Sequence, residues 1–198
     1  MNSDYASIDQ RLEKLVEVSR QDLEKIPESH GWPHSLDVMG YCVEIGKAEG
    51  ADLPILLAAA LLHDVGFLYG GESERHSKIG GKECVKYLKK VGYESHEIKK
   101  IQRCVAAHNV RYEGIEPETI GAKVLIDADT MTKIDEKSYD RAGNYMKENN
   151  INERDFAKNW VKSRTGLIAE GNMWQTETGR KIGTHLLKNA LKYWMNKM

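Results

Sequence analysis

The 198-residue sequence predicts one all-α domain. Apolar residues recur at three- and four-residue intervals through nearly every segment, which is the period of an amphipathic helix. No segment shows the convincing period-2 alternation of a half-buried strand, and no hairpin dipeptide lies between strand-like runs. Residues 123–126 resemble a short strand by residue type, but their surroundings favour a helix. We therefore expect helices throughout.

Proline, glycine and asparagine divide the sequence into successive helices. The first covers residues 8–26 and ends at Pro27, and the second, 33–47, opens with a proline, which is favoured in a first helical turn. Residues 53–65 are apolar on all sides, which predicts a fully buried central helix that ends at Gly66. Further helices are expected near residues 75–91, 95–109, 117–130, 136–148, 153–169 and 177–196.

Composition and charge restrict the class of protein. The 29 Lys and Arg residues nearly balance 30 Asp and Glu residues, so the charge supports neither a nucleic-acid surface nor an anionic-membrane surface. The longest apolar run, 55–62, has eight residues, whereas a bilayer span needs about 20. Residues 1–10 lack the apolar region of a secretory signal. Cys42, Cys84 and Cys104 form no Cys-x-x-Cys pair, so we expect reduced thiols and a cytoplasmic location.

Helical periodicity separates histidines that face inward from those that face outward. His34 shares its helix face with Val38 and Cys42, whereas His96 and His185 share theirs with lysines and are expected at the surface. The same test cannot orient His30, which precedes Pro33 in an irregular stretch. The polar residues predicted to face inward are His34, His63, Asp64, His76, His108 and Asp129.

These six inward groups together predict a metal site. A buried carboxylate needs a compensating cation, and no Lys or Arg lies on the same helix faces. Imidazole and carboxylate ligands suit one or two divalent transition-metal ions, namely Mn, Fe, Co, Ni or Zn. A purely structural polar core is the alternative interpretation.

The same residues resemble the H…HD…D motif of the HD-domain superfamily of metal-dependent phosphohydrolases. The strings HGWPH, AAALLHDVG and DAD occur in the order and at the spacing of that family, over roughly residues 28–135. The resemblance implies an all-α HD-domain-like helical bundle. The additional C-terminal helices expected at about 136–198 extend this bundle within one domain of residues 1–198. It also implies that His34, His63, Asp64 and Asp129 hold a metal ion.

Further elements resemble HD proteins that bind a second ion. His76 in RHSKIGG and His108 in VAAHN correspond to the ligands of that ion, with Asp64 as the bridge. The HD-GYP cyclic-dinucleotide phosphodiesterases differ, because they carry adjacent histidines where this chain has His108-Asn109 and a Lys where it has Phe67. We therefore do not expect that specific activity.

The resemblance and the inward groups together predict a phosphohydrolase. A metal-activated water would cleave a phosphate ester or anhydride of a small nucleotide-like molecule, with Asp64 as the catalytic residue that orients the water. Arg111, three residues after His108, and Lys78, near His76, are the candidate substrate-binding cations. Two alternatives remain open: a di-iron HD-type oxygenase with the same six ligands, and a nucleotide-sensing HD module without catalysis.

The C-terminal part of the sequence shows no pattern typical of catalytic or metal-binding residues. Apolar residues at helical spacing, such as Phe156, Trp160, Leu187 and Trp194, predict a packing face or the interface of a homodimer.

Overall fold

The computed structural model describes residues 4–72, 74–171 and 173–198, and within these ranges the chain is all-α, with helices and turns but no strand. The predicted fold class is therefore confirmed. The helices are α1 (Asp4–Ile8), α2 (Gln10–Leu23), α3 (Trp32–Glu49), α4 (Leu53–Leu62), the 3₁₀ helix η1 (Val65–Tyr69), α5 (His76–Lys90), α6 (Ser95–Ala107), α7 (Val110–Glu113), α8 (Ile120–Thr132), α9 (Lys137–Glu148), α10 (Glu153–Ala169) and α11 (Glu177–Met195).

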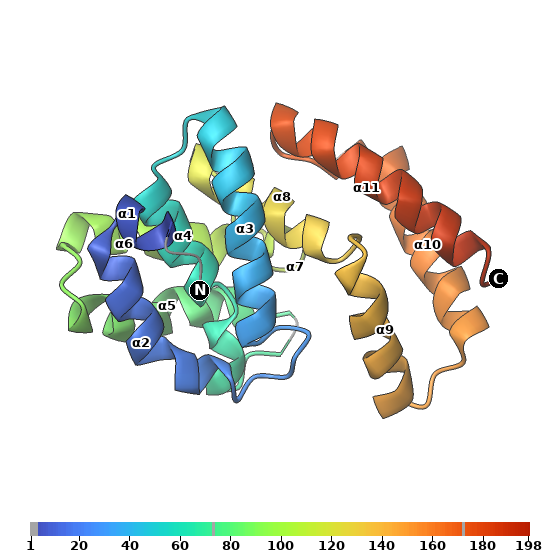
Figure 1. The fold of residues 1–198 in the computed structure, drawn as a ribbon, viewed down its shortest axis with the longest axis horizontal. Helices are drawn as coiled ribbons and strands as arrows, with labels where there is room; N and C mark the ends of the chain where they lie inside the picture. The colour runs from blue at the N-terminus through green and yellow to red at the C-terminus, as the bar shows by residue number, and fades with distance from the viewer. Residues whose placement is uncertain (1–3, 73, 172) are drawn as a thin grey trace.

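Helix α4 forms the centre of the larger part of the molecule. All residues from Ile55 to Leu62 are buried, as the uniformly apolar sequence predicts. Helices α2, α3, α6 and α8 pack around α4, and α5 packs on α6. Because an all-apolar helix is stable only when it is covered on every side, the other helices of this layer are arranged around it (Figure 1).

Local capping explains two of the differences between the expected and the observed helix boundaries. The first expected helix is divided because Asp9 caps α2, accepting a hydrogen bond from Arg11 N at 2.8 Å. The helix expected from residue 117 begins at Ile120, because the Thr119 side chain accepts from Ala122 N. The central helix was expected to reach Val65, but it ends at Leu62 and a 3₁₀ turn follows.

Helices α9, α10 and α11 form a second group at the side of the molecule (Figure 1). They share a separate hydrophobic cluster, in which Trp160 of α10 and Trp194 of α11 lie 5.9 Å apart between ring centroids. Helix α11 packs on α10 and also on α3 and α8, so it connects this group to the larger part.

A buried carboxylate fastens the start of α11 to α8. Asp127 on α8 accepts hydrogen bonds from Gln175 N at 2.8 Å, Thr176 N at 2.9 Å and Thr176 Oγ1 at 2.6 Å. A Cβ atom at Gly179 would lie 2.1 Å from Asp127 Oδ2, so only glycine permits this approach. These contacts satisfy the buried charge and fix α11 relative to α8.

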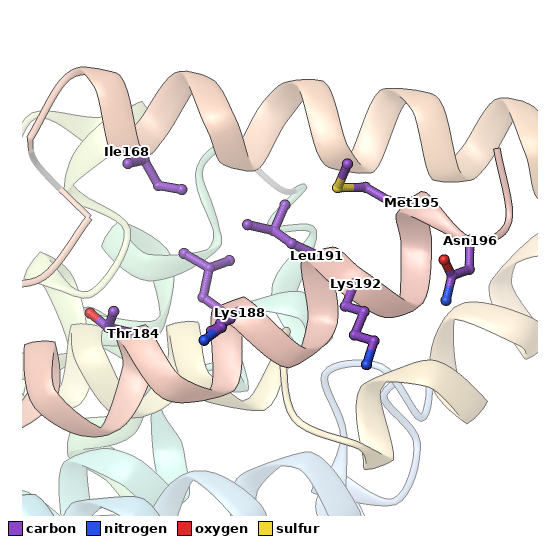
Figure 2. A pocket seen from close by; sticks show the side chains of 8 residues that line it. Ile168, Thr184, Lys188, Leu191, Lys192, Met195 and Asn196 are labelled. Carbon is purple, nitrogen blue, oxygen red and sulfur yellow. The ribbon is translucent and has the colours of Figure 1, made fainter.

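An apolar groove of about 550 Å³ runs between α10 and α11. In Figure 2, Ile168 of α10 points toward the side chains of Leu191 and Met195 on α11. None of the inward histidines or aspartates lines this groove, so it is separate from the candidate metal site. The apolar stripe at Phe156, Trp160, Leu187 and Trp194 packs within the hydrophobic cluster of this helix group, and the homodimer stays a prediction.

Among the described residues, no helix combines the length and the apolarity that crossing a membrane requires.

A bidentate ion pair joins the N-terminus of α2 to the N-terminus of α6, and its effect on stability depends on pH. Arg11 donates to the two Glu97 oxygens at 2.7 and 2.8 Å. The hydrogen bonds from Arg11 lower the pKa of Glu97 from 4.5 to about 2. Since the folded state holds this carboxylate ionised, the stabilisation is complete above pH 4.5 and is lost as the pH falls towards 2.

We therefore expect Glu97→Gln to flatten the acid side of the stability profile. The amide keeps the shape of the side chain but does not titrate. Urea unfolding between about pH 5 and about pH 3 should show a smaller loss of unfolding free energy in the variant than in the wild type. Parallel curves for the two proteins would contradict the assignment.

Candidate metal centre

Asp64 lies at the centre of the inward-facing histidines. Its Oδ2 atom is 3.2 Å from His63 Nε2 and 3.5 Å from His34 Nε2. Its Oδ1 atom is 3.2 Å from His76 Nε2 and 3.4 Å from His108 Nε2. Each carboxylate oxygen therefore faces a different pair of imidazoles.

Asp129 completes the first of these two groups, because its Oδ1 atom lies 3.3 Å from His34 Nε2. None of the six side chains is more than 9% exposed. Two triads, each with ligand atoms within 4.8 Å of one another, have the spacing of a metal site: His34, His63 and Asp129, and His63, Asp64 and His108. The structure thus brings together all six residues that the sequence selects, namely His34, His63, Asp64, His76, His108 and Asp129.

Helix ends supply most of these side chains. His34 lies in the first turn of α3, His76 begins α5, and His108 follows the last residue of α6. His63 follows the last residue of α4, and Asp64 lies between α4 and η1. Successive residues within an α-helix point about 100° apart. The end of α4 at Leu62 therefore provides the non-helical backbone at Asp64 that lets neighbouring side chains meet at one place.

Two of the imidazoles are held by backbone carbonyl groups. His63 Nδ1 donates to Ala60 O at 2.8 Å, and His108 Nδ1 donates to Val105 O at 2.7 Å. A carbonyl oxygen only accepts, so this geometry assigns the proton to Nδ1 in each neutral ring. The Nε2 atoms of both rings consequently point into the cluster.

The donor set fits a divalent metal ion. His63 Nε2 lies 3.1 Å from His34 Nε2, and His108 Nε2 lies 3.0 Å from His76 Nε2. Nitrogen and carboxylate oxygen atoms that converge at these distances repel one another unless a proton or a metal cation lies between them. Imidazole nitrogens fixed by backbone carbonyls, together with carboxylates, form a typical transition-metal ligand set.

The cluster keeps its two carboxylates ionised despite their burial. Burial by itself would raise the pKa of Asp64, but His63, His108 and His76 hold it well below its usual range. Burial likewise opposes ionisation of Asp129, whose pKa is held low by Lys133, His34 and His63. Burial lowers the pKa of His108, which favours the neutral ring that a metal requires.

Gly66 permits the second group of ligands to approach Asp64. A Cβ atom at Gly66 would lie 1.9 Å from His76 O and 2.7 Å from Gly80 N. The start of α5 therefore packs directly on the backbone of η1, and this packing places His76 beside Asp64.

Aromatic rings cover the side of the cluster near His76. Phe67 stacks on His76 with ring centroids 4.4 Å apart and planes 14° apart. The His30 ring lies 4.6 Å from Phe67 and 6.0 Å from His34. Burial lowers the pKa of His30 to about 4, so this ring is neutral at pH 7. The sequence could not orient His30, because it precedes the helix whose period would have shown its direction.

A cavity of about 300 Å³ opens beside the cluster between α8 and α10. His108 and Asp129 contribute to its wall, and so does Lys133, whose Nζ atom lies 2.6 Å from Asp129 Oδ2. From α10, Ser163 and Arg164 also line the cavity. The expectation that no Lys or Arg shares a helix face with the inward groups is wrong at Lys133, which lies one helical turn after Asp129 and reaches its carboxylate. No local pattern indicates Arg164.

The structure tests one of the two substrate-binding cations expected from the sequence, Lys78, but not the other, Arg111. Lys78 is exposed and lines a hollow between α5 and α6 that includes none of the six clustered residues, so the structure does not bring it to the cluster. The side chain of Arg111 lies outside the described residues, although its backbone belongs to α7.

Comparisons with known proteins agree with the geometry. A family model described as HD domain matches residues 31–134, slightly more than half of the chain. The fold is similar to the crystal structure of a predicted HD superfamily hydrolase from an uncultured Thermotogales bacterium, with a TM-score of 0.70 and 20% sequence identity. That match covers 99% of this chain and 97% of the other, and at this identity it establishes a shared fold. Comparison with curated proteins gives no match.

The close packing at Gly66 leads to a prediction for Gly66→Ala. The added methyl group must displace the first turn of α5, so we expect the free energy of unfolding of the metal-free protein to fall by about 1–3 kcal/mol. Gly40→Ala is the matched control, because a Cβ atom at Gly40 within α3 would meet no atom within 4 Å and the substitution should be neutral or stabilising. Equal stability of the two variants in urea unfolding would contradict this role for Gly66.

Proposed function

The chain belongs to the HD domain family, and from this premise we propose that it is a metal-dependent phosphohydrolase. Its substrate would be a phosphate ester or anhydride of a small, nucleotide-like molecule. The observation that carries the proposal is Asp64, whose two oxygens face separate imidazole pairs in a buried cluster.

The residues around Asp64 support binding of one or two divalent transition-metal ions, such as Mn, Fe, Co, Ni or Zn. His34, His63, Asp64 and Asp129 would hold the first ion. His76 and His108 would hold a second ion, with Asp64 shared between the two. A bound ion would act as a Lewis acid on a phosphoryl oxygen and lower the pKa of water from about 15.7 towards about 7.

The protein's own groups would position the reactants. Asp64 is ionised and can therefore accept a hydrogen bond from the attacking water, which orients the water toward phosphorus. The backbone carbonyls that fix His63 and His108 keep both rings from rotating. Burial of the cluster strengthens every charge interaction at the reacting phosphate, because little water is present to screen it.

A screen of phosphate compounds tests this proposal. We expect protein loaded with Mn or Co to hydrolyse at least one of a panel of generic phosphate esters and nucleotides. We also expect Asp64→Asn to bring metal content and turnover to background, since the variant removes the charge that both imidazole pairs face. Metal analysis and release of inorganic phosphate or pyrophosphate are the measurements.

A matched control shows whether the loss is specific to Asp64. Asp140→Asn removes an exposed aspartate of α9 and should leave metal content and turnover unchanged. Three outcomes would overturn the proposal: hydrolysis by metal-free protein, oxygen consumption by anaerobically purified di-iron protein, or nucleotide binding without any turnover. The second result would favour an HD-type oxygenase and the third a sensing module.

A further inference from the structure

The cavity between α8 and α10 joins the metal centre to the C-terminal helices. Ser163, Arg164 and Leu167 of α10 line this cavity together with His108 and Asp129. A volume of about 300 Å³ lies at the small end of the range for ligand sites. The C-terminal helices therefore form one wall of a site whose other wall carries the candidate metal ligands.

Lys133 gives the α8 side of this cavity a fixed positive charge. Its Nζ atom holds Asp129 Oδ2 at 2.6 Å, while Asp129 Oδ1 faces His34. The Lys133 side chain is 46% exposed, so the ammonium group retains room for a second anionic partner. An ammonium carries three donors, and one contact with Asp129 does not use them all.

Arg164 gives the α10 side a second positive charge. Its guanidinium carbon lies 5.1 Å from the centre of the Trp160 ring, and Nη1 donates to Ser163 Oγ at 3.1 Å. Stacking on Trp160 restricts the conformations of the long side chain, which reduces the entropy lost when a ligand binds. A planar guanidinium can bind phosphate through two parallel hydrogen bonds.

The distance between these two walls is fixed by the fold. Asp127, two residues before Asp129 on α8, holds Gln175 and Thr176 at the start of α11. Helix α11 in turn packs on α10. The wall that carries Arg164 is therefore fastened to the helix that carries Asp129 and Lys133.

We propose that Lys133 and Arg164 bind a second, non-reacting phosphate of the substrate while the first lies at the metal centre. The substrate class is accordingly a di- or triphosphate, in which a phosphoanhydride is cleaved, rather than a phosphate monoester. Helix α10 thereby supplies the part of the site that selects the substrate. This proposal rests on the phosphohydrolase function proposed above for the same cluster.

Binding of methylenediphosphonate, a diphosphate mimic that is not hydrolysed, tests the role of Arg164. We expect calorimetry on the Mn-loaded protein to show affinity about ten- to hundredfold weaker in Arg164→Gln, which is the usual loss for a charged hydrogen-bond donor. Arg154→Gln is the matched control, because Arg154 is exposed on the first turn of the same helix and does not line the cavity. The control should bind within about twofold of wild type.

Two more variants keep the test decisive if Arg164→Gln folds poorly. Arg164→Lys keeps the charge without the planar fork and should recover part of the affinity. Ser163→Glu places a negative charge on the cavity wall at an exposed position and should weaken binding at least as much as Arg164→Gln. Metal content should equal that of wild type in both variants.

The outcomes for this site and for the catalytic proposal are distinguishable. Wild-type diphosphonate affinity in Arg164→Gln and in Ser163→Glu would overturn the phosphate-binding role, even if the enzyme hydrolyses phosphate compounds. Equal losses of kcat/KM for a nucleoside monophosphate and a nucleoside triphosphate in Arg164→Gln would also overturn it. Arg164-dependent binding without hydrolysis of any compound would support the binding site and contradict the phosphohydrolase function.

Discussion

The burial of the Asp64 carboxylate is the constraint on which the rest of the structure depends. A carboxylate whose side chain is only 3% exposed is stable only if cationic or donor groups surround it. Here four imidazoles meet its two oxygens, and they come from helices α3, α4, α5 and α6. These helices can satisfy Asp64 only when all of them converge on the end of α4. The electrostatic requirement of one side chain thus fixes the relative positions of four helices.

The apolar sequence of α4 and the polar residues that follow it belong to the same arrangement. Because Ile55 to Leu62 are buried on all sides, α4 must lie in the middle of the bundle, and its end places His63 and Asp64 there as well. Gly66 then lets the chain turn close against the start of α5. Burial of the apolar helix therefore places His63 and Asp64 in the interior, and the neighbouring helices supply the side chains that contact Asp64.

The sequence could predict those features of the site that lie on regular helices. The 3.6-residue period assigned His34, Asp129 and His76 to inward faces, and it assigned His96 and His185 to the exposed surface, where the structure places them. It could not describe the end of α4, because the last residues of an apolar run carry no periodic signal. It was also silent on His30, which precedes α3 and reaches the site through a loop.

Cations were harder to predict than metal ligands for a physical reason. Lysine and arginine usually extend into solvent, so a lysine such as Lys133 is read as a surface residue even though it lies one helical turn after Asp129. Arg164 approaches the site only because α10 packs on α11 and α11 packs on α8, and these contacts join residues distant in sequence. No sequence pattern within α10 indicates that packing. The apolar residues of this helix indicate only that it takes part in the C-terminal hydrophobic cluster.

The charge balance of the chain gives these local cations their importance. A net charge of -1 provides no long-range attraction for a phosphorylated molecule, so any preference for anions must arise within about a Debye length of the site.

Asp127 and Asp129 have complementary roles on opposite faces of α8. One carboxylate fixes the C-terminal helices, and the other faces His34 and Lys133. Because both lie within one turn of a rigid helix, the positions of Arg164 and of the histidine cluster are determined together rather than independently.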